Sequence, residues 1–317
     1  MLDVHLFPHM SSSKPKKLPL IKPPRLNPGD LIGVVSPAGP VDKSEMKPDL
    51  DLLISSGFKF RAAPHLYDRH DYLAGDDEDR LSDLHAMFLD REIRAIFCAR
   101  GGYGSLRLLD KIDYDLIREH PKIIVGYSDI TALLMAIYDK TGLITFHGPM
   151  VRGLSSVSVN SLKSLLLILS SEQPVSFSPM EGNPLISGRA EGPLMGGNLS
   201  LICHLIGTPF FPSLDGCILI IEDRGEPLYR IDRMLTHLAL AGQIKGLAGL
   251  IGGDFVDCGN KSAIEGLLHT LASDLKIPLI TGFPSGHGLK NLALPLGMPA
   301  HLDTDLMTLS TLEPCVI

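Results

Sequence analysis

Short apolar runs that alternate with helical segments constrain the fold of this chain more than any other feature. Strands are expected at 30–37, 58–63, 94–98, 122–125 and 143–147, with helices at 43–56, 77–88, 105–110 and 132–137. Strands that alternate with helices predict a parallel sheet with helices on both faces. Ligand sites in such sheets lie at the carboxyl ends of the strands.

The length of 317 residues is enough for two domains, and we expect the second half of the chain to form the second one. Ser, Pro and Gly crowd the interval that begins at residue 166, as in a linker. We expect a flexible tail at 1–26, a first domain at 27–165, a linker at 166–185 and a smaller mixed α/β domain at 186–317. Expected elements of the last are helices at 199–206, 228–241 and 263–275, strands at 217–221, 247–251 and 278–281, and a terminal strand pair.

Charge and cysteine content exclude several classes of protein. The net charge of −7 and the lack of a large basic block argue against nucleic acid as a partner. The five cysteines form no C-x-x-C pair, which favours neither zinc nor disulfides and fits a reducing compartment. The N-terminus has no signal-peptide core, and the apolar stretches are too short to span a membrane. We therefore expect a soluble, cytoplasmic protein.

Ser128 stands between the expected strand at 122–125 and the helix at 132–137. A serine in such a turn is lifted out of the sheet toward the positive end of the helix, where a nucleophile of acyl transfer is needed. The alternative is that Ser128 or Asp129 merely caps the helix.

A serine nucleophile needs a base and a carboxylate that orients it. His287 is the best candidate for the base, because flanking glycines leave its imidazole accessible. Glu222 is the best carboxylate, since it ends the apolar run 217–221, with Asp223 and Glu226 as close competitors. A loop histidine without any role is the alternative for His287.

The Gly-rich loop at 99–104 follows an expected strand and could hold an anion on its backbone N–H groups. It matches neither the dinucleotide fingerprint G-x-G-x-x-G nor the phosphate loop G-x-x-x-x-G-K-[ST]. We therefore expect an oxyanion hole that combines an N–H near Gly102 with that of Asp129. The alternative is a tight turn in which glycine is required sterically.

Taken in order, several segments resemble the LD-carboxypeptidase family, the muramoyltetrapeptide carboxypeptidases, to which a microcin-immunity peptidase also belongs. The resemblance covers about residues 25–312 and is carried by 33–39, 72–75, 100–104, 126–129, 196–199, 207–209, 222–233, 252–255 and 286–288. It implies a triad with Ser128 as nucleophile, His287 as base and Glu222 as orienter. It also implies a flavodoxin-like first domain, a swivelling second domain, a cytoplasmic homodimer and no cofactor or metal.

The resemblance further implies release of the terminal D-alanine from a muropeptide, either UDP-MurNAc-tetrapeptide or the free tetrapeptide, in peptidoglycan recycling. The free carboxylate of the leaving residue calls for a cation. Arg100, Arg230 and Arg233 are candidates, with salt bridging as their alternative role, and Tyr103 and Asn198 are further substrate-binding candidates.

Three other functions remain possible at this point. A member of the same family could cleave peptidyl- or aminoacyl-nucleotides with the same triad. A noncatalytic protein could use the Gly-rich loop to hold an anion. A metal-dependent hydrolase is disfavoured, because the histidines show no H-x-x-x-H or comparable ligand spacing.

Overall fold

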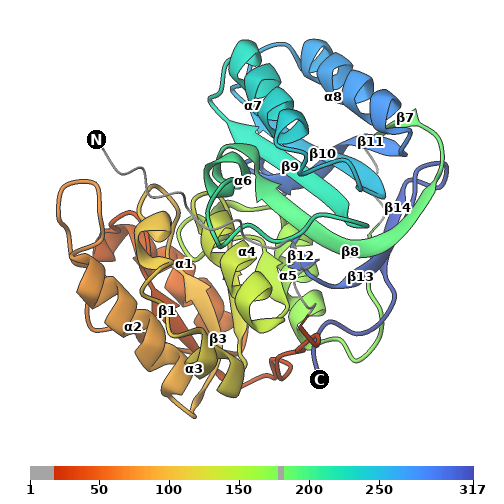
Figure 1. The fold of residues 1–317 in the computed structure, drawn as a ribbon. Coiled ribbons are helices and arrows are strands. Elements are labelled where there is room, and N and C mark those ends of the chain that lie inside the picture. Colours follow the sequence, from red (N-terminus) through yellow and green to blue (C-terminus); the bar gives the residue numbers. More distant parts are fainter. Residues whose placement is uncertain (1–17, 178–181) are drawn as a thin grey trace, which may run out of the picture.

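The computed structural model describes residues 18–177 and 182–317, which form two β-sheets and the helices packed around them (Figure 1). The first sheet has the strand order β12-β5-β4-β3-β1-β2. Its strands are β1 (Leu31–Val35), β2 (Lys59–Ala62), β3 (Ile93–Cys98), β4 (Ile123–Gly126), β5 (Thr145–His147) and β12 (Leu294–Leu296). Strands β1 to β5 are parallel, and their order 2-1-3-4-5 is that of flavodoxin-like sheets. The predicted parallel α/β arrangement is confirmed.

Helices and short 3₁₀ turns connect the strands of this sheet. They are α1 (Lys43–Ser55), α2 (Asp77–Leu89), η1 (Ser105–Leu108), α3 (Tyr114–Glu119), α4 (Ile130–Thr141), η2 (Leu154–Ser156) and α5 (Val159–Ser170). Helix α4 is buried nearly all round, because it also contacts α6 and β8 of the C-terminal half. A helix in such a place must be apolar on every face.

Neither α4 nor any other helix within the described ranges is long and apolar enough to cross a membrane.

The second sheet has the order β6-β14-β13-β8-β9-β10-β11-β7. Its strands are β6 (Ser176–Phe177), β7 (Asn183–Ile186), β8 (Arg189–Asn198), β9 (Ile218–Arg224), β10 (Gly249–Val256), β11 (Leu279–Gly286), β13 (Pro299–Asp303) and β14 (Thr308–Thr311). The central strands β8 to β11 are parallel, and the outer ones pair antiparallel. Helices α6 (Leu199–Leu205), α7 (Leu228–Leu240) and α8 (Lys261–Leu275) follow β8, β9 and β10. The mixed α/β character predicted for this half is confirmed.

The expected linker at 166–185 is wrong for the residues that the structure describes there. The segment includes the end of α5, and its strands β6 and β7 pair with β14 and β11 of the second sheet. Antiparallel edge strands tolerate Pro and Ser, so a composition typical of a linker also fits a strand at a sheet edge. Residues 178–181 lie outside the described part of the chain.

The flexible tail expected at 1–26 is wrong for residues 18–26, whereas residues 1–17 lie outside the described part. Ile21 forms a parallel bridge with Leu143, and Leu26 is only 1% exposed. The Arg25 amide donates to the Ile317 carbonyl, and the Ile317 amide donates to the Pro23 carbonyl. The N-terminal segment is thereby fixed to the C-terminus through backbone hydrogen bonds, which composition does not reveal.

The helix expected at 105–110 is instead the 3₁₀ turn η1, and α3 begins only at Tyr114. The Ser105 amide and hydroxyl both donate to Asp129, so a tertiary contact fixes the start of this turn. Asp113 then caps α3 by accepting from the Leu116 amide. Strands β9 to β11 also run three to five residues beyond their predicted ends at 221, 251 and 281. Pairing between Phe255 and Asp223 continues the sheet through polar residues that predict a loop.

Candidate active site

Ser128 lies in a sharp turn between β4 and α4. Its φ of 63° is in the left-handed region, which is strained for any residue with a side chain. Two glycines make room for this turn: a Cβ on Gly126 would stand 2.6 Å from Ile130, and one on Gly101 would stand 2.9 Å from the Ser128 Cβ. The turn therefore holds the serine hydroxyl at the carboxyl edge of the first sheet.

His287 and Glu222 reach Ser128 from the second sheet. The His287 Nε2 lies 3.1 Å from the Ser128 Oγ, although the two residues are 159 positions apart in the chain. The His287 Nδ1 lies 2.6 Å from the Glu222 Oε2. His287 directly follows β11 and Glu222 lies within β9, so two strands of one sheet position the histidine and the carboxylate. The arrangement is that of a nucleophile, a base and an orienting acid.

The Glu222 carboxylate is buried, and glycines allow its close approach to His287. A Cβ on Gly286, whose φ is 121°, would stand 2.5 Å from the Glu222 Oε2. Burial raises the pKa of Glu222, whereas the hydrogen bond from His287 acts in the opposite direction and favours the carboxylate. A carboxylate at this position can accept the Nδ1 proton of His287, so that the Nε2 lone pair can face the Ser128 hydroxyl.

The two competing acids have other partners. Asp223 accepts from the Asn198 side-chain amide at 2.9 Å and from the Ser200 hydroxyl at 2.7 Å. Glu226 pairs with Arg230 at 3.2 Å on the surface of α7. Of the three acids that the sequence proposed, Glu222 is therefore the one whose carboxylate meets His287.

Helix capping does not account for Ser128 or Asp129. Asp129 stands at the position before α4, but its side chain makes no capping hydrogen bond. Its carboxylate instead accepts from the Ser105 amide at 2.8 Å. Burial raises the pKa of Asp129, and the hydrogen bonds from Ser105 oppose this shift. Asp129 thus ties the serine turn to the segment that follows the Gly-rich loop.

The Gly-rich loop lies where the strand order reverses, between the ends of β1 and β3. The Gly39 amide donates to the Gly101 carbonyl at 3.1 Å, and Gly102 (φ 114°) stands beside the Gly39 backbone. Gly101, not Gly102, is the glycine in contact with Ser128. A Cβ on Gly101 would also stand 3.4 Å from the Asp129 amide nitrogen. The two segments expected to supply an oxyanion hole therefore meet at the serine.

A buried arginine fixes the far end of this loop. Arg80 of α2 is 2% exposed and donates to the Gly104 carbonyl at 3.1 Å and to the Pro37 carbonyl. It also binds Asp77 at 2.5 Å. Arg80 thereby joins the loops that follow β1 and β3, and the sequence analysis did not single it out.

The remaining substrate-binding candidates lie in different surroundings. Arg100 donates to the Pro40 carbonyl at 3.3 Å, and Tyr103 is 46% exposed with its ring edge-on to Tyr72. Asn198 is buried, caps α6 through the Leu201 amide and stands opposite Glu222 in the β8–β9 register. Arg230, paired with Glu226, lies on exposed α7, as does Arg233, which stacks on Tyr229. Only Arg100 and Tyr103 belong to the loop at the serine.

Two aromatic rings behind the triad were also missed by the sequence analysis. The Tyr127 ring lies 5.0 Å from that of His287 and 6.0 Å from that of His147, edge-on in both cases. His147, at the end of β5, is fully buried, and burial lowers its pKa to about 3. Neither ring nitrogen of His147 has a hydrogen-bond partner within the described residues. A neutral imidazole therefore lies where the two halves meet. In the sequence, the only sign of its place was that His147 ends the strand next to the one that precedes Ser128.

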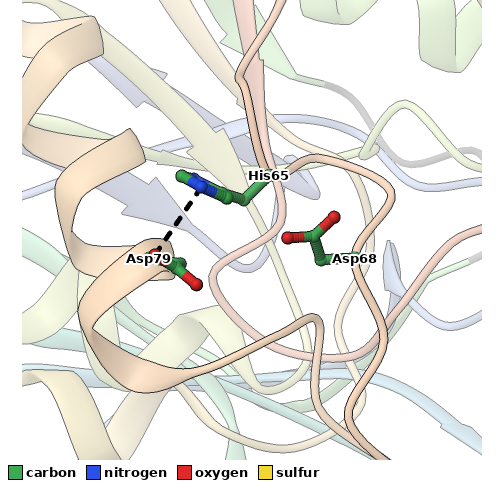
Figure 2. A group of neighbouring side chains, drawn as sticks. All are labelled: His65, Asp68 and Asp79. Atoms are coloured by element: carbon green, nitrogen blue, oxygen red, sulfur yellow. Dashed lines mark ion pairs between the residues drawn. The ribbon is translucent and has the colours of Figure 1, made fainter.

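One group of potential metal ligands occurs in the described ranges, and Figure 2 shows its three side chains. None of them belongs to the triad. His65 and Asp68 follow β2, and Asp79 lies at the start of α2; two strands, β1 and β3, separate β2 from β4 in the sheet. The His65 Nδ1 binds Asp83 at 2.9 Å, and this hydrogen bond raises the pKa of His65. The Asp79 carboxylate lies 3.6 Å from the His65 Nε2, and the charges of Asp79 and Asp68 raise the pKa of His65 further.

The fold and the site define a two-sheet α/β protein with a Ser–His–Glu group where its halves meet. Comparison with known proteins then places it. The LD-carboxypeptidase N-terminal domain matches residues 32–148, and the LD-carboxypeptidase C-terminal domain matches residues 191–302. The chain belongs to the LD-carboxypeptidase family.

Two curated relatives and two solved structures illustrate the range of proteins to which the chain is similar. A probable murein peptide carboxypeptidase of Bacillus subtilis is 42% identical, over 89% of this chain and 92% of its own. The microcin C7 self-immunity protein MccF of Escherichia coli is 31% identical, over 93% of this chain and 96% of its own. A structure of MccF with glutamyl sulfamoyl guanosine has a TM-score of 0.88 at 27% identity and covers 94% of this chain and 100% of that one. A muramoyltetrapeptide carboxypeptidase from Oxalobacter formigenes has a TM-score of 0.79 at 29% identity, covering 88% of this chain and 97% of its own.

Proposed function

We propose that this protein is a serine-type LD-carboxypeptidase that releases the terminal D-alanine from muramoyl tetrapeptides. The observation that supports this most directly is the chain of contacts from the Ser128 Oγ through His287 to Glu222, at 3.1 and 2.6 Å. The relatives named after murein peptides support the substrate class. The proposal includes a role in recycling cell-wall peptides in the cytoplasm and a homodimeric assembly.

The reaction begins when the Ser128 Oγ attacks the carbonyl carbon of the L-centred residue, while the His287 Nε2 takes the hydroxyl proton. Glu222 stabilises the imidazolium that forms. Amide N–H groups of the Gly101–Gly102 segment and of Asp129 face the oxyanion, and such donors contribute roughly 3–4 kcal/mol each. The C–N bond then breaks, and His287 gives its proton to the departing amine of D-alanine. Water, activated by the same histidine, hydrolyses the ester and restores Ser128.

The test is D-alanine release from UDP-MurNAc-tetrapeptide by the wild type and matched variants. We expect Ser128→Ala and His287→Ala to lower kcat by roughly 10⁴- to 10⁶-fold. Glu222→Gln keeps the size of the side chain but loses its charge, and we expect a loss of about 10⁴-fold. Glu226→Gln is the control and should stay within about twofold, because the Glu226 carboxylate pairs with an exposed arginine rather than with His287. Near-normal activity of Ser128→Ala would show that the nucleophile is assigned wrongly.

A second candidate is cleavage of peptidyl- or aminoacyl-nucleotides by the same triad. It is favoured by the match to MccF, whose structure with glutamyl sulfamoyl guanosine superposes over nearly the whole chain. Assaying the wild type with an aminoacyl sulfamoyl nucleoside beside the tetrapeptide separates the two. If the enzyme hydrolyses the aminoacyl sulfamoyl nucleoside but not the tetrapeptide, the second function is supported. If it releases D-alanine from the tetrapeptide but does not hydrolyse the nucleoside compound, the first is supported.

A further inference from the structure

A small pocket lies beside the triad, on the side of the histidine. Its volume is about 150 Å³, and its lining includes Tyr127, Met150, Arg152, Gly288, Leu289 and Asn291. Gly288 follows His287 in the chain, and the Tyr127 ring packs against the imidazole. The pocket therefore lies next to the His287 imidazole, and its residue Arg152 is bonded to Ala99 at the start of the Gly-rich loop.

The chemistry of acyl transfer decides which part of a substrate can occupy that side. The imidazole that accepts the serine proton later gives it to the departing amine, so the leaving residue must lie next to the His287 Nε2. The acyl oxygen, in contrast, must face the backbone amides of the oxyanion hole. The departing residue is thus directed toward this pocket, whose small volume fits one short amino acid.

Arg152 is the one charged residue that lines the pocket within the described part of the chain. Its backbone is held firmly, because the Arg152 amide donates to the Ala99 carbonyl at 2.8 Å. The next turn is fixed by the buried Asp49 of α1, which accepts from the Gly153 amide at 2.9 Å and from the Ser155 hydroxyl at 2.6 Å. The guanidinium therefore projects from a rigid turn rather than from a loose loop.

The present partner of Arg152 can be exchanged for a substrate. The Arg152 side chain is 43% exposed and pairs at 3.2 Å with Glu45, which is 51% exposed. An ion pair with this exposure is weak. A substrate carboxylate enclosed in the pocket can instead receive two parallel hydrogen bonds from a guanidinium. Arg100 stands nearby, and burial, followed by the charge of Arg152, lowers its pKa. Arg100 and Arg152 are thus close enough for their charges to interact, and the charge of Glu45 partly offsets this effect on Arg100.

We propose that Arg152 binds the free α-carboxylate of the departing residue and so makes the enzyme a carboxypeptidase. This inference rests on the proposed function, because it names the group of the substrate that the same site selects. An internal peptide bond has no carboxylate at this position and would leave the guanidinium without its partner. Arg152 was not among the arginines proposed from the sequence.

The experiment compares UDP-MurNAc-tetrapeptide with its C-terminal amide, in the wild type and in Arg152→Gln. We expect the variant to lower kcat/KM for the acid by roughly 10- to 100-fold, as for the loss of a hydrogen bond to a charged group. The same variant should change kcat/KM for the amide by less than about twofold, and Arg152→Lys should recover part of the activity on the acid. An equal loss on both substrates, or no loss on either, would overturn the proposal.

Arg118→Gln is the matched control. Arg118 is an exposed arginine of α3, a helix that precedes β4 and thus lies toward the edge of the sheet opposite Ser128. We expect it to leave the preference between acid and amide unchanged.

Binding separates failure of this proposal from failure of the proposed function. Ser128→Ala should bind the acid more tightly than the amide by calorimetry, and Arg152→Gln in that background should remove the difference. Suppose that the wild type fails to cleave the peptide although Ser128→Ala binds the acid more tightly than the amide. That result would refute the proposed function and leave the role of Arg152 intact. A preference for the acid that survives Arg152→Gln would refute that role.

Discussion

Backbone strain at Ser128 is a local sign of function at the scale of a single residue. A side chain at φ 63° costs of the order of 1–3 kcal/mol and persists only where the surroundings impose it. Here Gly126 and Gly101 supply the space, and the Asp129 carboxylate binds the Ser105 amide. A serine that only capped a helix would need none of these contacts, since capping residues have ordinary extended backbones.

The buried imidazole of His147 leads us to expect that the free energy of unfolding depends on pH. Its folded pKa of about 3 lies below the ordinary value of 6.5, so the unfolded chain binds the additional proton between these values. The contribution of neutral His147 to stability is therefore complete above pH 6.5 and is lost as the pH falls toward 3. We expect the free energy of unfolding of the wild type, relative to His147→Phe, to fall by about 2 kcal/mol between pH 7 and pH 5.

Urea denaturation at the two pH values measures this difference. His269→Phe, which alters an exposed histidine of α8, is the control and should show the same pH dependence as the wild type. A difference between wild type and His147→Phe that does not change with pH would mean that His147 titrates normally.

At the scale of elements, the loops at the carboxyl edge of the first sheet are fixed by side chains from neighbouring helices. Arg80 of α2 binds the Pro37 and Gly104 carbonyls, and Asp49 of α1 binds the turn that carries Arg152. Buried carbonyls and amides need such partners, since an unpaired group costs about 1–3 kcal/mol. The helices thus hold the loops that form the site.

Arg80 and Arg107 form a matched pair for testing this idea, because both bind Asp77. Arg80→Met leaves two carbonyls and a carboxylate without a buried partner, and we expect it to lower the free energy of unfolding by about 3 kcal/mol. Arg107 is 45% exposed, and Arg107→Met should cost less than about 1 kcal/mol. Equal effects in urea denaturation would show that Arg80 acts only through Asp77.

At the scale of the whole molecule, segments distant in sequence join the two halves. Strand β12 comes from the C-terminal half yet forms the edge of the first sheet beside β5. Helix α4 packs against both halves, and residues 18–26 bind the C-terminus. The triad spans the same junction, so the contacts that hold the halves together also set the distance between Ser128 and His287.

Leu26 tests the contribution of the N-terminal segment. It is 1% exposed, and its amide donates to the Leu169 carbonyl. We expect Leu26→Ala to lower the free energy of unfolding by about 3 kcal/mol through lost apolar burial and the cavity left behind. Leu20 is 38% exposed, and Leu20→Ala should cost less than about 1 kcal/mol. If thermal unfolding gave the same shift for both variants, the packing of Leu26 would not matter to the fold.

Local sequence patterns were enough to predict the alternation of strands and helices and the turn that carries Ser128. These features depend on neighbours a few residues away, which a local pattern records. The sequence also limited the orienting acid to Glu222, Asp223 and Glu226, and it favoured Glu222 because this residue ends the apolar run 217–221. The ends of β9 to β11 were missed, because pairing with neighbouring strands, not residue preference, extends them.

The folded chain was needed to show which acid meets His287, which glycine contacts Ser128, and that Arg152 lines the pocket beside them. These facts concern residues up to 159 positions apart, and no local pattern fixes which distant side chains share a buried junction. The same holds for β12 and for residues 18–26, whose Pro-rich composition resembles that of a loose tail. Their place follows from the surface that they cover and the backbone groups that they pair, which exist only once the two sheets have formed.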